Sequence, residues 1–234
     1  MNFQAIKTEL KKQGTPERAK SLSWFLKTGL GQYGYGDKFF GVVVPEQRIV
    51  ARKFWQIDLD EVEKLIYDEY HECRLTGFLI LVEKFQKGDE RIKKQIYNFY
   101  LKHSKQTNNW DLVDLSAPKI VGAYLLNKKS ERKILYKFAK SKNLWQKRIA
   151  VVATYAFIKN KDFQDTLAIS EILLYDKHDL IQKAVGWMLR EIGKIDVAVL
   201  ENFLVEYHKV MPRTMLRYAI EKFAEKKRRV YLTK

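Results

Sequence analysis

The spacing of Trp110 and Asp114 could place an indole and a carboxylate together in a catalytic site. They are four residues apart, so on a helix they lie on the same side, and Asp114 adjoins an apolar stripe that includes Val113 and Ala117. A carboxylate at the edge of an apolar stripe and beside a tryptophan is a candidate acid, base or electrostatic group. The alternative is a structural aspartate paired with a neighbouring arginine. Spacing alone leaves these two interpretations equally open.

Trp187 lies outside the apolar stripe of its helix. At about 100° per residue, it falls about 40° from Lys183, and Arg190 falls about 20° to the other side of Lys183. The apolar residues of this helix gather on the opposite side: Val185, Met188, Leu189 and Ile192. A tryptophan is usually a core residue, but this angle favours a basic, exposed face. There an indole can pack against a sugar or a base.

The composition restricts the elements that can position these residues. The 234 residues include 11 Gly and 4 Pro, too few for the turns of an all-β protein, and 13% aromatic residues argue against disorder. The single Cys73 excludes an internal disulfide, a thiolate zinc site and a four-cysteine iron–sulfur cluster. The four histidines show no pair at metal-ligand spacing. We therefore expect a mostly helical protein.

The formal net charge of +16 requires an explanation, because self-repulsion opposes the compact state. Nucleic acid, an anionic membrane surface or an acidic protein could use it, although a lysine-rich composition can also reflect genome base composition. No secretion signal is visible at the N-terminus, and no run approaches about 18 apolar residues. We therefore expect a cytoplasmic protein that does not cross a membrane.

Apolar periodicity predicts helices along almost the whole chain, with short connections that make neighbours antiparallel. The exception is the glycine-rich segment 28–44. Its G-x-G-x-x-G match does not indicate dinucleotide binding, because no strand precedes it and no βαβ unit surrounds it. The predicted helices cover residues 2–12, 16–27, 45–54, 58–69, 72–86, 89–103, 110–126, 131–140, 144–159, 163–174, 179–193, 196–207 and 212–224.

The helices repeat. Similar ones begin near Glu72, Trp110, Trp145, Ile181 and Pro212. The segments WQKRIAVVATYAF and IQKAVGWMLREIG align without a gap, 36 residues apart. A period of this size with two helices per unit is typical of HEAT-like repeats. We predict an all-α fold, an α-solenoid forming one domain over residues 1–234 with a concave surface, rather than an irregular helical bundle.

Arg148 lies near the start of the predicted helix 144–159, which is the equivalent, one repeat earlier, of the helix that carries Trp187. It forms a stripe with Tyr155 and Lys159, apart from the apolar stripe of the same helix. A solvated surface cation is the ordinary alternative, but the repeat position favours a surface shared with Trp187. The run Lys226–Arg229 is more typical of a solvated chain end, although it could touch DNA.

The sequence resembles the AlkD-type DNA alkylation repair family, whose members are DNA glycosylases built from HEAT-like repeats. Together the matching pieces are specific, and they span nearly the whole chain. They are GYGDKFFGVVVPEQR at 34–48, NNWDLVDLSAPKIVG at 108–122, NLWQKRIAVVATYAF at 143–157, LIQKAVGWMLREIGK at 180–194 and MPRTMLRYAIEKF at 211–223.

The resemblance implies a role for each candidate. Trp110 and Trp187 match the tryptophans that flank the sugar of the damaged nucleotide, Asp114 matches the catalytic carboxylate, and Arg148 matches an arginine essential to the site. It also implies removal of cationic alkylpurines, of the 3-methyladenine and 7-methylguanine type, from double-stranded DNA. No metal, nucleotide or other cofactor is implied, and the base is not flipped into a pocket.

Basic residues around these candidates are expected to contact the DNA backbone. Lys183, Arg190 and Arg217 are the candidates for binding phosphates, and the protein is expected to act as a monomer. The alternative is a homologue that keeps the fold without activity, as a DNA-binding module or a protein scaffold. A scaffold would not require Trp187 on a basic stripe or Asp114 beside Trp110.

Overall fold

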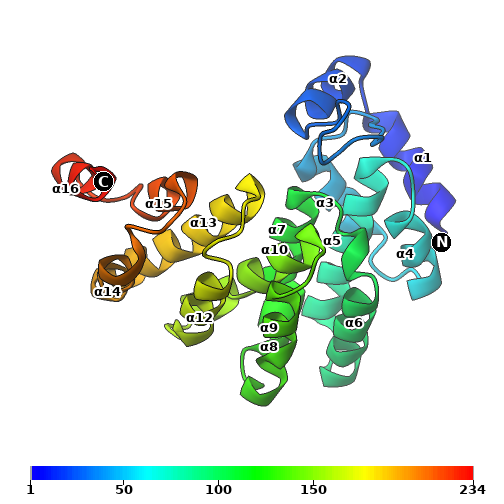
Figure 1. Ribbon diagram of the computed structural model, residues 1–234. Helices are drawn as coiled ribbons and strands as arrows, with labels where there is room; N and C mark the ends of the chain where they lie inside the picture. Colours follow the sequence, from blue (N-terminus) through cyan, green and yellow to red (C-terminus); the bar gives the residue numbers. More distant parts are fainter. Residues whose placement is uncertain (1, 234) are drawn as a thin grey trace. The chain divides into compact units, whose positions relative to one another are not determined.

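The computed structural model describes residues 2–233, and the described chain is helical apart from loops and one isolated bridge between Lys38 and Tyr70 (Figure 1). The predicted all-α class is confirmed. Contacts divide the chain into two compact units, one up to Ser116 and one from Ala117 onward. The single continuous domain over residues 1–234 stays a prediction.

The N-terminal unit is built around one long buried helix. Its elements are α1 (Phe3–Gln13), α2 (Pro16–Phe25), α3 (Val44–Lys53), α4 (Leu59–Ile66), α5 (His71–Lys87), α6 (Glu90–Lys102), η1 (Ser104–Gln106) and α7 (Trp110–Ala117). Residues 71–82 of α5 are all buried, and α3, α4 and α6 pack against this helix. Side-chain caps start several of these helices, among them Thr15, which precedes Pro16 at the start of α2.

The glycine-rich segment is an ordered loop anchored to the first turn of α5. The buried carboxylate of Glu72 accepts hydrogen bonds from the backbone N–H groups of Phe40, Gly41 and Val42 at 3.1, 2.8 and 3.2 Å. Gly41 has φ +90°, and a Cβ there would lie 2.2 Å from the Thr15 carbonyl oxygen. Only glycine fits this close approach, which fixes the path of the loop beside α2.

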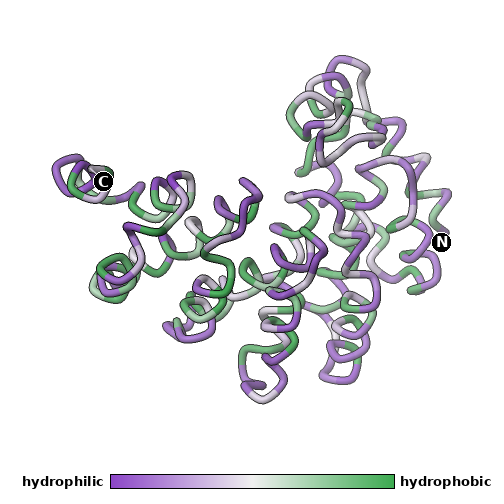
Figure 2. Tube along the Cα trace, viewed as in Figure 1, coloured by the Kyte–Doolittle hydropathy of each residue, from purple (hydrophilic) through white to green (hydrophobic). Residues whose placement is uncertain are grey.

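The C-terminal unit is organised around α13 (Asp179–Ile195). Its other elements are η2 (Pro118–Gly122), α8 (Ala123–Leu125), η3 (Lys129–Arg132), α9 (Lys133–Ala139), α10 (Leu144–Ala153), α11 (Tyr155–Lys159), α12 (Gln164–Ile172), α14 (Val197–Tyr207), α15 (Arg213–Ala219) and α16 (Glu225–Leu232). Hydrophobic residues recur along the helices of each unit (Figure 2), and their buried members form the core.

Close packing of α13 against α15 depends on Gly186. A Cβ at this position would lie 2.4 Å from the Met215 carbonyl oxygen, so the two helices approach more closely than any other residue would allow. The apolar residues predicted for this helix, including Val185 and Met188, are buried. Gly186 therefore sets the distance at which the next residue, Trp187, stands from α15.

The observed helices differ from the predicted ones in several places, and one is the helix predicted over 212–224, which ends at Ala219. The helix predicted over 110–126 is interrupted by a π-helical segment at Pro118–Gly122, and the helix predicted over 144–159 is divided at Thr154. Residues Glu225–Leu232, read as a chain end, form α16. Proline lacks the backbone N–H that a regular helix needs, which accounts for the interruption at Pro118.

Candidate functional site

Trp110 begins α7 and is held by the loop and by α2. The Asn109 side chain accepts a hydrogen bond from the Trp110 backbone N–H at 2.8 Å. The indole Nε1 donates to the Tyr33 hydroxyl at 3.2 Å, and the ring of Phe25 meets it edge-on with centroids 5.6 Å apart. Trp110 remains half-buried, so part of its indole is accessible.

Asp114 lies one turn after Trp110 on the same side of α7, as the spacing predicts, and it too is half-buried. Its apolar neighbours Val113 and Ala117 are buried. Burial raises the pKa of Tyr100, and the negative charge of Asp114 contributes to that rise. Trp110 and Asp114 are therefore brought together by one helical turn, with a carboxylate beside a partly exposed indole.

Asp111, the residue after Trp110, belongs to a largely buried group of charged residues, the His71 cluster, which consists of Asp37, His71, Arg74 and Asp111. His71 Nε2 lies 2.8 Å from Asp111 Oδ2, and His71 Nδ1 lies 3.3 Å from Asp37 Oδ2. Arg74 Nη2 lies 2.6 Å from Asp37 Oδ1. The cluster joins the loop (Asp37), α5 (His71 and Arg74) and α7 (Asp111).

Charges within this cluster shift its pKa values. Burial by itself would lower the pKa of His71, but the charge of Asp111 and hydrogen bonds to both aspartates raise it to about 9. Burial would raise the pKa of Asp37, but hydrogen bonding to His71 and the charge of Arg74 hold it below its usual value. The imidazole is therefore cationic at neutral pH, and it holds the start of α7 against α5.

In the C-terminal unit, Trp187 stands at the edge of the core rather than within it. It is half-buried, and its ring lies 6.0 Å from that of Tyr155, a member of the predicted basic stripe. Its Nε1 donates to Glu191 Oε1 at 3.2 Å. The same oxygen accepts from Lys194 Nζ at 2.7 Å and from Arg190 Nη2 at 3.3 Å. Glu191 is itself buried, so it fixes the indole and both cations.

Arg148 is a buried residue of α10 and not the solvated cation of the alternative interpretation. It is 5% exposed, and its Nη1 donates to the Leu180 carbonyl at 2.5 Å. Leu180 belongs to the first turn of α13, so Arg148 ties α10 to the helix that carries Trp187. Burying a guanidinium costs free energy unless its N–H groups are hydrogen-bonded. We therefore expect the side chain of Arg148 to keep one position within the unit.

The three predicted phosphate contacts lie on α13 and α15. Lys183 Nζ lies 2.7 Å from Asp179 Oδ2, one turn earlier. Arg190 contacts Glu191 and also pairs with Glu221, so a phosphate would have to compete with two carboxylates there. Arg217 is exposed. Whether the residues of α7 and those of α13 share one surface stays a prediction.

The comparison that decides the family covers nearly the whole chain. Residues 6–223 match the family described as DNA alkylation repair enzyme. The chain belongs to this family. The resemblance seen in the sequence is thereby confirmed.

A solved structure supports the same fold for this DNA alkylation repair family member. A protein from Enterococcus faecalis described as a "Predicted DNA alkylation repair enzyme" superimposes with a TM-score of 0.72 at 18% sequence identity. The match covers 91% of this chain and 98% of the other. The fold is therefore the α-solenoid of the family, as predicted. A comparison with curated proteins gives no match.

Across residues 2–233, no group of three or more His, Cys, Asp or Glu side chains is arranged to bind a metal ion. None of the described helices is both long and apolar enough to cross a membrane. Cys73 is buried, and burial raises the pKa of its thiol, which leaves it a poor nucleophile.

Two acidic residues that support the site were not predicted as part of it. Glu191 lies four residues after Trp187, a spacing that brings side chains together on a helix, so this signal was present in the sequence. Asp111 lies in the first turn of its helix, where an acidic residue is explained by the helix dipole alone. Its partner His71 is 40 residues away, and no local pattern indicates such a pairing.

Proposed function

We propose that this chain is a DNA glycosylase that releases cationic alkylated purines, such as 3-methyladenine and 7-methylguanine, from double-stranded DNA. The observation that carries the proposal is the pairing on α7: the half-buried carboxylate of Asp114 lies one turn from a half-buried indole, which Tyr33 holds through its Nε1. Membership of the DNA alkylation repair family supports DNA as the substrate.

Breaking the glycosidic bond of a cationic alkylated purine does not need a strong general acid. An alkylated purine that carries a positive charge is already a good leaving group, because the electron pair of the breaking glycosidic bond neutralises it. The deoxyribose becomes an oxocarbenium-like cation, water adds at its anomeric carbon, and one proton is released. Asp114 stabilises the cation and orients the water, while the faces of Trp110 and Trp187 present negative quadrupole density to the sugar.

In this mechanism the damaged base stays outside the protein and the sugar is the group that is recognised. Arg148 holds α10 to α13 and so supports Trp187. Lys183, Arg190 and Arg217 supply positive charge for the phosphates. No metal or cofactor takes part in any step.

The test is release of 7-methylguanine from methylated duplex DNA by the purified full-length protein, without added metal. We expect chromatography to show free 7-methylguanine well above the spontaneous release from DNA alone, with an abasic site left in the strand. Duplex binding without release would overturn the glycosylase assignment and favour a DNA-binding module. Absence of both binding and release would favour a protein scaffold.

A further inference from the structure

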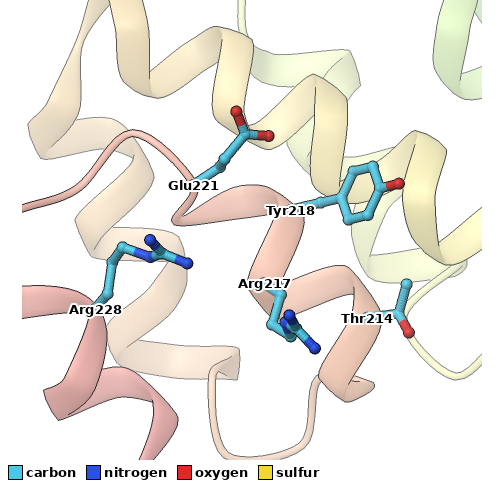
Figure 3. Close-up of a pocket in the computed structure, with 5 residues that line it drawn as sticks. All are labelled: Thr214, Arg217, Tyr218, Glu221 and Arg228. Carbon is cyan, nitrogen blue, oxygen red and sulfur yellow. The ribbon is translucent and has the colours of Figure 1, made fainter. Parts of the chain in front are cut away.

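A surface hollow in the C-terminal unit lies between α15 and α16. Its volume is about 440 Å³, and five residues line it: Thr214, Arg217, Tyr218, Glu221 and Arg228. Figure 3 shows the guanidinium of Arg228 reaching from α16 toward α15, the helix that carries Thr214, Arg217 and Tyr218. Two guanidinium groups therefore line one small hollow.

The two arginines of the hollow are not neutralised within the described chain. Among residues 2–233, no carboxylate lies within ion-pairing distance of Arg217 or Arg228. The Nε atom of Arg228 is buried and has no hydrogen-bond partner there. A buried guanidinium donor without a partner is costly, so an acceptor supplied from outside would stabilise it.

Glu221, the one acid of the hollow, is already neutralised by residues that do not line it. Lys222 lies 3.1 Å away, and Arg190 pairs with the other carboxylate oxygen. Hydrogen bonds from Lys222 and then Arg190 hold the pKa of Glu221 below its usual value, so the carboxylate is ionised and occupied. The hollow therefore retains a net positive charge from Arg217 and Arg228.

We propose that this hollow is a phosphate-binding subsite in which Arg217 and Arg228 together bind one phosphate of the DNA backbone. The identity of the partner rests on the proposed function. A guanidinium presents parallel N–H donors that match two phosphate oxygens, so two such groups form a selective phosphate site.

The hollow is connected to Trp187 by a continuous chain of contacts. Glu221 pairs with Arg190, Arg190 contacts Glu191, and Glu191 accepts from the Trp187 indole. A phosphate bound by Arg217 and Arg228 would thus be held at a fixed distance from Trp187. The subsite sets the register of the backbone along this unit and contributes no group to bond cleavage.

The test uses undamaged duplex DNA, so its result does not depend on excision. We expect the plot of log affinity against log salt for Arg228→Gln to have a slope smaller by about 0.9 than wild type. Arg228→Lys should keep the slope and lower the affinity, because the charge remains and the paired donors are lost. The matched control is Arg229→Gln, whose guanidinium is exposed and pairs with Glu225, and it should match wild type.

A scan with neutral methylphosphonate linkages identifies the phosphate. One position in the duplex should weaken binding of wild type and have no effect on Arg228→Gln. A wild-type slope for Arg228→Gln, with no such position, would overturn the subsite. If inorganic phosphate raises the melting temperature of wild type more than that of Arg228→Gln while duplex slopes stay equal, the assignment to DNA is overturned. A protein that shows the subsite yet releases no base would refute the glycosylase proposal alone.

Discussion

His71 Nε2 lies 2.8 Å from Asp111 Oδ2, and this contact joins the first turn of α5 to the first turn of α7. Asp111 in turn accepts the backbone N–H of Leu112 at 2.9 Å. Because Asp111 directly follows Trp110, the histidine fixes the direction in which α7 presents both the indole and, one turn later, Asp114. The candidate site of the N-terminal unit is therefore supported by a buried charge pair.

The His71 cluster predicts a loss of stability at alkaline pH. The pKa of His71 is raised from its ordinary 6.5 to about 9, so the folded state binds the proton more tightly than the unfolded chain. The resulting stabilisation, up to about 3 kcal/mol, is fully present below about pH 6.5 and is lost as the pH rises through about 9. Urea unfolding at pH 6, 8 and 10 measures it, with His71→Gln as the variant that lacks this dependence. Equal pH profiles for both proteins would contradict the assignment of His71 as a cation.

Asp114→Asn is expected to keep the fold and duplex binding while losing most base excision. The amide has nearly the same shape, but it lacks the negative charge that faces the developing sugar cation. We expect single-turnover release of 7-methylguanine at saturating protein to fall about 100- to 1000-fold. Asp58→Asn, a change at an exposed position before α4, should retain the wild-type rate. Wild-type excision by Asp114→Asn would make the carboxylate structural, and loss of folding would make it a buried ion-pair partner.

Glu191→Gln should destabilise the C-terminal unit. The buried Oε1 of Glu191 accepts from Trp187 and lies near two cations. A neutral amide leaves Lys194 without its counter-charge and leaves Arg190 paired with Glu221 alone. We expect a loss of about 1–3 kcal/mol in the free energy of unfolding, measured with urea. Glu225→Gln removes an exposed pair and should cost no more than about 0.5 kcal/mol. An equal loss in the free energy of unfolding for the two variants would show that Glu191 does not stabilise the C-terminal unit more than an exposed ion pair does.

Gly186→Ala tests the close packing of α13 on α15. The added Cβ would lie 2.4 Å from the Met215 carbonyl oxygen, so the helices must move apart, at a cost of about 1–3 kcal/mol. Gly31→Ala is the comparison, because Gly31 has φ +75° but open space around it, and the strain alone should cost about 1 kcal/mol. Differential scanning calorimetry compares the two. Gly186→Ala at wild-type stability would mean that the helices can separate freely.

The sequence predicted the helices well because each buries one apolar face, and that periodicity is local. Trp187 was correctly expected outside the apolar stripe for the same reason, and it is half-buried. The burial of Arg148 was not predicted, because it depends on a carbonyl in the next helix pair. The pairing of His71 with Asp111 likewise joins distant segments, and such contacts form only when the elements pack.

The convergence of Trp187, Arg190 and Lys194 on a single oxygen of Glu191 has a consequence for how this unit tolerates change. The three donors share one acceptor, so the energetic effect of replacing any of them depends on which others remain. Losing Arg190 would leave Glu191 Oε1 shared between Trp187 and Lys194, and would leave Glu221 paired with Lys222 alone. Substitutions at these positions are therefore expected to be epistatic. The order in which single substitutions can accumulate is restricted, because the cost of each depends on those already present. Tolerated replacements would alter several of these residues together.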